Sequence, residues 1–243
     1  MRLPDAHCHP QGLVPIPSSQ ELRRLGIGGF LANGTHPENW EATLRLARAA
    51  GGKAALGLHP WQAALWTPEV NATLSRSSSQ LVAVGEIGLD GTRRWKAQLP
   101  LQKECFRGQL ELAEQASLPV VLHGVGAYGS LLEILRERPP ACGFLLHGYH
   151  GSLEMIPLFL RLGGFFSLGP RELRSEKGRQ ALGKVPPDRL LLESDFQAQA
   201  NSPLTAWSNP LREALKEASQ VLGRPPENLA ASLSANFQEL FLR

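Results

Sequence analysis

The sequence predicts a single α/β domain folded as a (β/α)₈ TIM barrel, and three observations carry this prediction. Eight short apolar runs follow one another along the 243 residues, and stretches with helical period lie between them. No linker, repeat or low-complexity tract divides the chain, so residues 1–243 are expected to form one barrel. A doubly wound open sheet is the competitor, but ligand-type residues that end five different runs meet at one mouth only in a closed ring.

The predicted elements follow in order along the chain. We expect strands at 3–7, 29–33, 54–58, 81–86, 119–123, 143–147, 164–168 and 190–194. Helical patterns occur at 38–50, 98–116, 131–138 and 153–162, and then at 209–222 and 226–241. In the second pattern Leu99, Phe106 and Leu110 recur at helical spacing and form one apolar face. The helix at 209–222 should complete the outer layer, and the C-terminal helix at 226–241 should close the barrel.

Composition narrows the class of protein further. The hydrophobic fraction of 42% supports a large core and argues against disorder, and the net charge of +3 suits anionic substrates without requiring nucleic acid. The three cysteines form no CxxC motif, which favours reduced thiols in a cytoplasmic protein. No apolar run approaches the length of a membrane span, so we expect no membrane partner.

Histidines and carboxylates stand at the ends of five predicted strands. They are His7 and His9 after the first run, Glu86, His123 and His147 after the fourth, fifth and sixth, and Asp195 after the eighth. Imidazole and carboxylate are the side chains that bind catalytic divalent metals, and one carboxylate bridging two metals is an arrangement that hydrolases use to activate water. The pattern therefore predicts a metal-dependent hydrolase.

The two-residue period of a strand predicts which side chains share a face. Asp5 should point the same way as His7 and His9, while Cys8 points toward the helices. Val82 and Val84 should share a face with Glu86, and Glu193 should share one with Asp195. Asp5 and Glu193, one layer deeper than the ligands, are expected to orient the ligating imidazoles or to hold a nearby amide.

At these residues the chain resembles the TatD family of metal-dependent deoxyribonucleases, within the amidohydrolase-like barrels. The motifs that carry the resemblance are DAHCHP (5–10), GLHP (57–60), VAVGEIGLD (82–90), LPVVLH (118–123), HGYHGS (147–152), LLLESD (190–195) and SANFQELF (234–241). The resemblance implies an exonuclease-type enzyme that acts on DNA ends or oligonucleotides, with two divalent ions drawn from Zn, Mn, Mg, Ni or Fe. It places His7, His9 and Asp195 on one ion, His123 and His147 on the other, and Glu86 between them, with Asp195 also as general base.

Some substrate-facing positions depart from the family pattern. The family has serine and arginine after the fifth-strand histidine, where this chain has Gly124 and Val125, and it has serine where His150 stands. Arg171, just after the seventh run, is the best candidate to replace the missing arginine at phosphate. Other expected substrate contacts are His59, Trp61, Tyr149 and His150.

Two alternatives remain open at this stage. The first is a hydrolase of amides, esters or cyclic amides on the same barrel, which the missing arginine favours. The second is a barrel without enzymatic activity that serves as a metal-binding subunit of a larger assembly. Absence of a ligand would favour the second alternative, and all six ligand positions are present.

Overall fold

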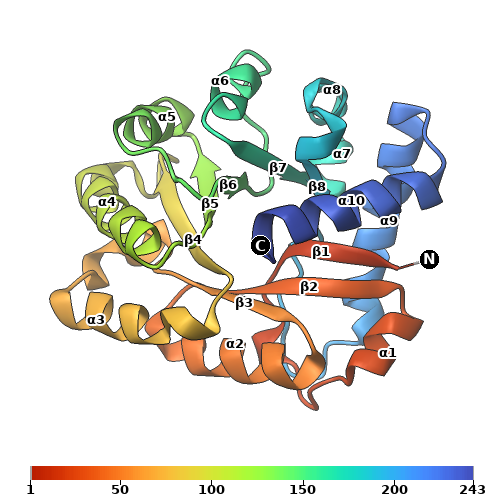
Figure 1. Cartoon of the computed structure of the whole chain (residues 1–243), viewed down its shortest axis with the longest axis horizontal. Coiled ribbons are helices and arrows are strands. Elements are labelled where there is room, and N and C mark those ends of the chain that lie inside the picture. The colour runs from red at the N-terminus through yellow and green to blue at the C-terminus, as the bar shows by residue number, and fades with distance from the viewer. Residues whose placement is uncertain (1, 243) are drawn as a thin grey trace.

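Eight parallel strands form one sheet in which each strand pairs with the next one along the chain (Figure 1). The computed structural model describes residues 2–242. The strands are β1 (Leu3–Cys8), β2 (Ile27–Gly34), β3 (Lys53–Leu56), β4 (Ala83–Asp90), β5 (Val120–Val125), β6 (Phe144–Leu146), β7 (Gly164–Leu168) and β8 (Leu190–Leu192). All eight predicted strands are thus present, with ends shifted by a few residues.

The chain after β8 returns to β1 and nearly closes the sheet into a barrel. The backbone N–H of Asp195 donates to the carbonyl of His7 over 3.1 Å, and the N–H of His9 donates to the carbonyl of Phe196 over 2.7 Å. These bonds join the first and last strands at their carboxyl ends. The prediction of a (β/α)₈ barrel is therefore confirmed, and the open-sheet alternative is wrong.

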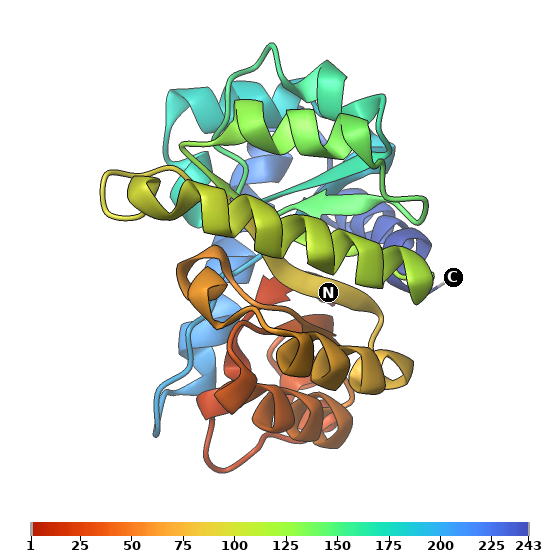
Figure 2. The same cartoon turned by 90° about the vertical axis from the view of Figure 1, so that its left-hand side faces the viewer.

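Helices cover the outside of the strands, and Figure 2 looks onto α3, α4 and α5, which lie side by side there. The helices are α1 (Ser19–Arg24), α2 (Pro37–Ala50), α3 (Pro68–Ser77), α4 (Leu99–Gln115), α5 (Tyr128–Glu137), α6 (Ile156–Leu160), α7 (Pro170–Leu173), α8 (Glu176–Lys184), α9 (Leu204–Leu222) and α10 (Pro226–Phe241). Within residues 2–242, no helix combines the length and the hydrophobicity that crossing a bilayer requires.

The long helices match the sequence prediction, whereas four short helices were not predicted. Helices α1, α3, α7 and α8 have only four to ten residues, too few for a clear apolar period. Three of them begin at a side-chain cap instead: Ser18, Thr67 and Ser175 each accept a hydrogen bond from a backbone N–H in the first turn. Helix α6 is shorter than the predicted 153–162 because it occupies only Ile156–Leu160.

The barrel interior is an apolar column to which every strand contributes one buried side chain. These are Ala6, Leu31, Ala55, Ala83, Val121, Leu145, Phe165 and Leu191. Phe237, Leu240 and Phe241 of α10 belong to the same cluster. The side-chain amide of Asn236 in α10 donates to the carbonyl of Leu190, where β8 begins, over 2.7 Å. Helix α10 therefore closes the amino-terminal end of the barrel, as predicted.

On β4, the strict alternation expected of a strand predicts the wrong face for Val84. Ala83 occupies the barrel interior, whereas Val84 packs with Ile87 in the core between strands and helices. The pairing of β4 with β5 is irregular between Val84 and Ile87, and this irregularity shifts the period before Glu86. Glu86 faces the interior as expected, but Val84 does not share its face.

The same correction applies to β1. Ala6 lies in the interior, and Asp5 instead meets the indole of Trp207 from α9, outside the strands. The pairing of β1 with β2 is irregular between Asp5 and Cys8. The expectation that Asp5 shares a face with His7 is therefore wrong, while Cys8 packs toward the helices as predicted.

Candidate metal centre

A cavity of about 790 Å³ opens at the carboxyl ends of the strands. Its volume lies within the range of ligand and substrate sites in proteins. Ten of the predicted site residues line it: His9, His59, Trp61, Glu86, His123, His147, His150, Arg171, Glu193 and Asp195. His7 is fully buried behind them.

Glu86 stands at the centre of the histidines, and its carboxylate is almost completely buried. Its Oε2 atom lies 3.3 Å from Nε2 of His7 and 3.5 Å from Nε2 of His9. Its Oε1 atom lies 2.8 Å from Nδ1 of His123 and 2.8 Å from Nε2 of His147. Both carboxylate oxygens therefore face imidazoles, and one carboxylate can contact two cations at once.

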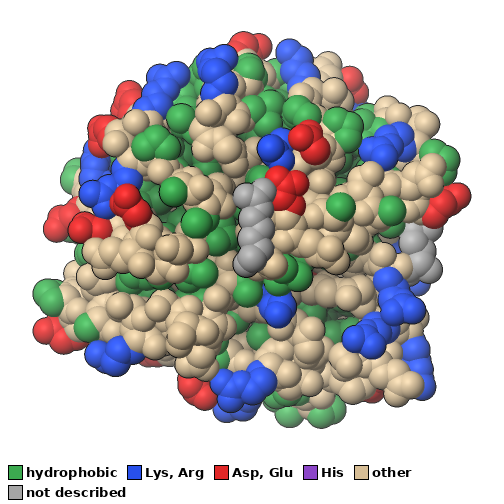
Figure 3. Space-filling model, in the orientation of Figure 1, with side chains coloured by type: hydrophobic (Ala, Val, Ile, Leu, Met, Phe, Trp, Pro, Cys, Tyr) green, Lys and Arg blue, Asp and Glu red, His purple; other side chains and the backbone are tan. Residues whose placement is uncertain are grey.

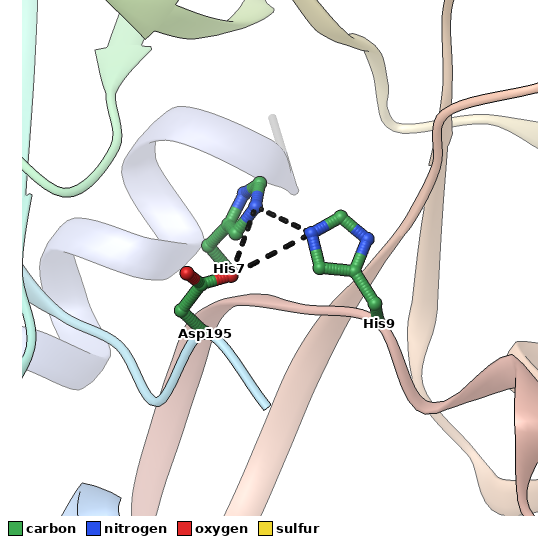
Figure 4. Close-up of side chains that lie close together, drawn as sticks. All are labelled: His7, His9 and Asp195. Atoms are coloured by element: carbon green, nitrogen blue, oxygen red, sulfur yellow. Dashed lines mark hydrogen bonds and ion pairs between the residues drawn. The ribbon is translucent and has the colours of Figure 1, made fainter. Parts of the chain in front are cut away.

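His7, His9 and Asp195 form a second group of candidate metal ligands (Figure 4). The two Nε2 atoms are 3.0 Å apart, and Oδ1 of Asp195 lies 4.0 Å from His7 and 3.7 Å from His9. Asp195 follows β8 in a loop, with a left-handed φ of 47°. Its carboxylate is 43% exposed, against 11% or less for the other five predicted ligands, so it is the ligand that substrate reaches most easily.

The spacing of these donor atoms fits a divalent cation. Ligands about 2.0–2.1 Å from a tetrahedral metal lie about 3.3 Å from one another, close to the separations seen here. Nδ1 of His9 faces the carbonyl of Asn33 and must carry the proton there, so in the neutral ring Nε2 presents a lone pair to this centre, as a metal ligand does. The imidazole of His123 lies between two carboxylates, with Nδ1 2.8 Å from Oε1 of Glu86 and Nε2 3.5 Å from Oδ2 of Asp90.

Outer partners fix the orientation of two imidazoles. Nδ1 of His9 lies 2.9 Å from the backbone carbonyl of Asn33 on β2. Nδ1 of His147 lies 3.4 Å from Oε1 of Glu193, whose other oxygen accepts a short hydrogen bond from Ser167. Such contacts leave Nε2 of each ring directed at the shared centre. Glu193 thus lies where an orienting residue is expected.

The electrostatics of the centre favour a positive charge. Burial alone would raise the pKa of Glu86, but the surrounding His147, His59 and His7 hold it well below its usual value. Burial lowers the pKa of His7 to about 3, and the nearby His147 adds to this effect. Burial opposes protonation of His147 as well, yet Glu86 and Glu193 raise its pKa well above the usual value. Buried carboxylates ringed by imidazoles therefore favour a positive charge at this centre.

The structure adds two residues to the predicted set around Glu86. Nε2 of His59, expected to touch phosphate or a nucleophilic water or else to hold the Pro60 turn, lies 3.3 Å from Oε1 of Glu86 and can serve as a further ligand. Asp90, which the sequence did not single out, places its Oδ2 3.5 Å from Nε2 of His123 and accepts a hydrogen bond from the indole of Trp61 over 2.6 Å. Its position four residues after Glu86 on the same strand is the signal that could have revealed it.

One wall of the cavity is aromatic. Trp61 is 45% exposed and stacks on Trp95, with ring centroids 5.5 Å apart and planes inclined by 11°. The guanidinium of Arg94 lies 4.9 Å from the centre of the Trp95 ring. The hydrogen bond to Asp90 holds the Trp61 ring beside His123, with ring centroids 6.1 Å apart.

Two predicted contacts need correction. Of its two expected roles, Asp5 does not orient an imidazole but does hold a nearby amide: its carboxylate accepts hydrogen bonds from Trp207 over 2.7 Å and from the backbone N–H of Ser194 over 2.9 Å. It therefore supports the loop that carries Asp195. Tyr149 is fully buried and its hydroxyl donates to the carbonyl of Ser152, so it cannot meet substrate. Its ring fills the core because the strand period no longer applies after β6 ends at Leu146.

His150 and Arg171 do reach the cavity. Both side chains are exposed, His150 after β6 and Arg171 in the first turn of α7. Arg171 forms no hydrogen bond or ion pair within residues 2–242, and its guanidinium is available to an anion. Val125, which stands where the family pattern has an arginine, also lines the cavity.

A (β/α)₈ barrel that gathers imidazoles around a buried carboxylate at its carboxyl end defines the class of metal-dependent, amidohydrolase-like hydrolases. The chain belongs to the family of TatD-related DNases, whose family model matches residues 4–242. The prediction of a TatD-type metal-dependent hydrolase is therefore confirmed.

Relatives of known sequence and structure extend this finding. The chain is 31% identical over 260 residues to the uncharacterized metal-dependent hydrolase YjjV of Escherichia coli, covering 99% of this chain and 98% of YjjV. It is 31% identical over 237 residues to the 3′-5′ ssDNA/RNA exonuclease TatD of Erwinia tasmaniensis, covering 91% of each. The crystal structure of Escherichia coli YjjV, a TatD homologue, superposes with a TM-score of 0.85 at 30% identity, covering 100% of this chain and 98% of that one.

Proposed function

We propose that the protein is a two-metal phosphodiesterase that removes nucleotides from the ends of single-stranded DNA. The observation that carries the proposal is that the two carboxylate oxygens of Glu86 face different imidazoles. Oε2 faces His7 and His9, and Oε1 faces His123 and His147. In this proposal the first pair and Asp195 hold one divalent ion, the second pair holds another, and Glu86 bridges them. Such ions would lower the pKa of water and stabilise charge on the phosphoryl oxygens. Their identity among Zn, Mn, Mg, Ni and Fe stays open.

Asp195 is the proposed acid–base residue. Its carboxylate faces the imidazoles of His7 and His9 on one side and the open cavity on the other. This position supports the proposal that Asp195 orients an attacking water molecule and accepts its proton. Asp5, through Ser194, holds the loop that presents it.

A nucleic-acid substrate is supported by the aromatic wall and by the relatives. An exposed indole stacked on a second one offers a surface for a base, and stacking contributes about 1–3 kcal/mol per base in single-strand binders. The Erwinia tasmaniensis relative is named a 3′-5′ ssDNA/RNA exonuclease. We extend that substrate class to this chain, while a cytoplasmic location stays a prediction of the sequence.

A second candidate function rests on Val125. Its apolar side chain lines the cavity where an arginine is expected, which favours an uncharged amide, ester or cyclic amide. Arg171 and Arg94 line the same cavity and supply positive charge from other parts of the chain, so the phosphodiester remains the better fit.

The test compares substrates side by side. Oligonucleotides labelled at the 3′ or the 5′ end, a simple ester and a simple amide are incubated with each divalent metal, and a chelator serves as the blank. The proposal expects stepwise shortening from one end only, dependent on metal. Rapid turnover of the ester or amide with intact oligonucleotides would instead establish the second candidate.

A further inference from the structure

A second cavity, of about 630 Å³, lies away from the metal centre between α1, the starts of β1 and β2, and α9. Leu3, Leu211 and Leu215, all buried, form its apolar floor. We call this cavity the basic groove because of the side chains on its rim. They are Arg2, Arg23, Arg24, Arg212 and Lys216.

The rim of the basic groove carries a concentration of positive charge. None of the described residues that line it is acidic. The whole chain has a net charge of +3, so the five positive charges on this rim are more than the net charge of the entire molecule. Figure 3 shows Lys and Arg side chains gathered over α1 and beside the start of β1. The guanidinium of Arg212 donates hydrogen bonds to the neutral side chains of Ser208 and Asn209, which leave its charge in place.

The positive side chains lie on both sides of the basic groove. Arg212 and Lys216 are four residues apart and therefore lie on one face of α9. Arg23 and Arg24, at the end of α1, and Arg2, beside β1, line the same groove from the other elements. A single small anion can use two or three such cations. A row of cations over an apolar floor fits an extended polyanion that has apolar faces.

Helix α9 connects the basic groove with the metal centre. Pro210 lines the cavity of the metal centre, whereas Ser208, Leu211 and Arg212 line the basic groove. From Pro210 to Lys216 the helix advances about 9 Å. The groove begins at the start of β1, roughly 20 Å along that strand from His9 at the metal centre, so only a strand several nucleotides long can reach both.

We infer that the basic groove binds the sugar–phosphate backbone of a single-stranded nucleic acid whose end occupies the metal centre. This inference rests on the proposed function. The five cations neutralise phosphates, and the leucine floor accepts the faces of sugars or bases. The groove holds long strands in place between cleavage steps and contributes nothing to substrates too short to reach it.

The test uses the double variant Arg23→Gln/Arg24→Gln and a matched control, Arg45→Gln/Arg136→Gln. The control removes the same charge from exposed positions on α2 and α5, outside both cavities. Fluorescence anisotropy measures the Kd of a labelled single strand in a chelator, so that no turnover occurs, over a series of salt concentrations. Steady-state kinetics with metal then compare KM for that strand and for a dinucleotide.

The inference expects Kd and KM for the long strand to rise by about tenfold in the groove variant, with the dinucleotide unchanged. The slope of log K against log salt should become shallower by about 1.4, since each phosphate that is no longer neutralised removes about 0.7 for single strands. Equal Kd and slope in the groove variant, the control and the wild type would overturn the inference. Equal weakening in both variants would also overturn it, because it indicates a general field effect. If neither substrate is hydrolysed, the proposed function is refuted. The anisotropy measurements of Kd would still test whether the basic groove binds the strand.

Discussion

The two ends of the barrel differ completely in chemistry although the same strands build both. At the amino-terminal end, Leu240 and Phe241 of α10 seal an apolar column. At the carboxyl end, imidazoles and carboxylates converge on Glu86. Packing stabilises the first end, whereas the second concentrates polar groups whose burial costs free energy.

The change between the two ends takes place within two residues of a strand. Val121 belongs to the apolar column and His123 to the metal centre, and the same step leads from Leu145 to His147. Side chains two apart share a face, so each strand contributes to both layers. The comparison teaches that stability and activity are separable here, because they depend on different layers of one interior.

The largest expected effect is on activity at the open end. Glu86→Gln keeps the volume of the side chain but removes the charge that serves both pairs of imidazoles, so metal content and turnover should collapse. We expect kcat/KM on oligonucleotides to fall by more than about a thousandfold, with the circular dichroism spectrum of a folded barrel. Metal analysis and kinetics check this, and near-normal turnover by the metal-loaded variant would remove Glu86 from the centre.

Next in size is a decrease in stability at the closed end. Leu240→Ala opens a void in the apolar column and should lower the free energy of unfolding by about 2–5 kcal/mol. Activity per folded molecule should stay unchanged. Urea unfolding measures the decrease, and Leu242→Ala, at a 43% exposed position two residues on, should change stability by less than about 0.5 kcal/mol. Equal effects of the two variants would show that α10 does not seal the barrel.

Metal binding should couple to stability at the open end alone. Divalent metal at a hundred times its Kd should stabilise the wild type by about 2.7 kcal/mol, which raises Tm by about 5–10 °C at this chain length. Leu240→Ala should gain the same increment, whereas Glu86→Gln should gain almost nothing. Thermal melts with metal and with chelator measure this, and an increment retained by Glu86→Gln would place the metal elsewhere.

The smallest expected effect is at the rim of the open end. Arg171→Ala should lower kcat/KM on oligonucleotides by about tenfold, the value of one charged hydrogen bond of about 1.5 kcal/mol, without changing metal content. Arg174→Ala is the control, since Arg174 pairs with Glu213 and lies outside the cavity. If both variants behave like the wild type, Arg171 does not bind phosphate in place of the arginine that is missing at Val125.

The sequence by itself determined the barrel, its order of elements and the six residues that converge on the centre. Each of these depends on local information: apolar runs of strand length, helical period between them, and a ligand-type side chain at the end of a run. His123 and His147 were predictable because their strands are regular up to the point where the chemistry begins.

Only the tertiary structure decided how neighbouring layers meet. Irregular pairing in β1 and β4 changed the faces of Asp5 and Val84, and no local pattern determines the register between two strands. Burial of Tyr149 and the contact of His59 with Glu86 likewise depend on elements far apart in the chain. The physical reason is that a side chain's type is local, whereas its surroundings are fixed only when the ring of strands closes.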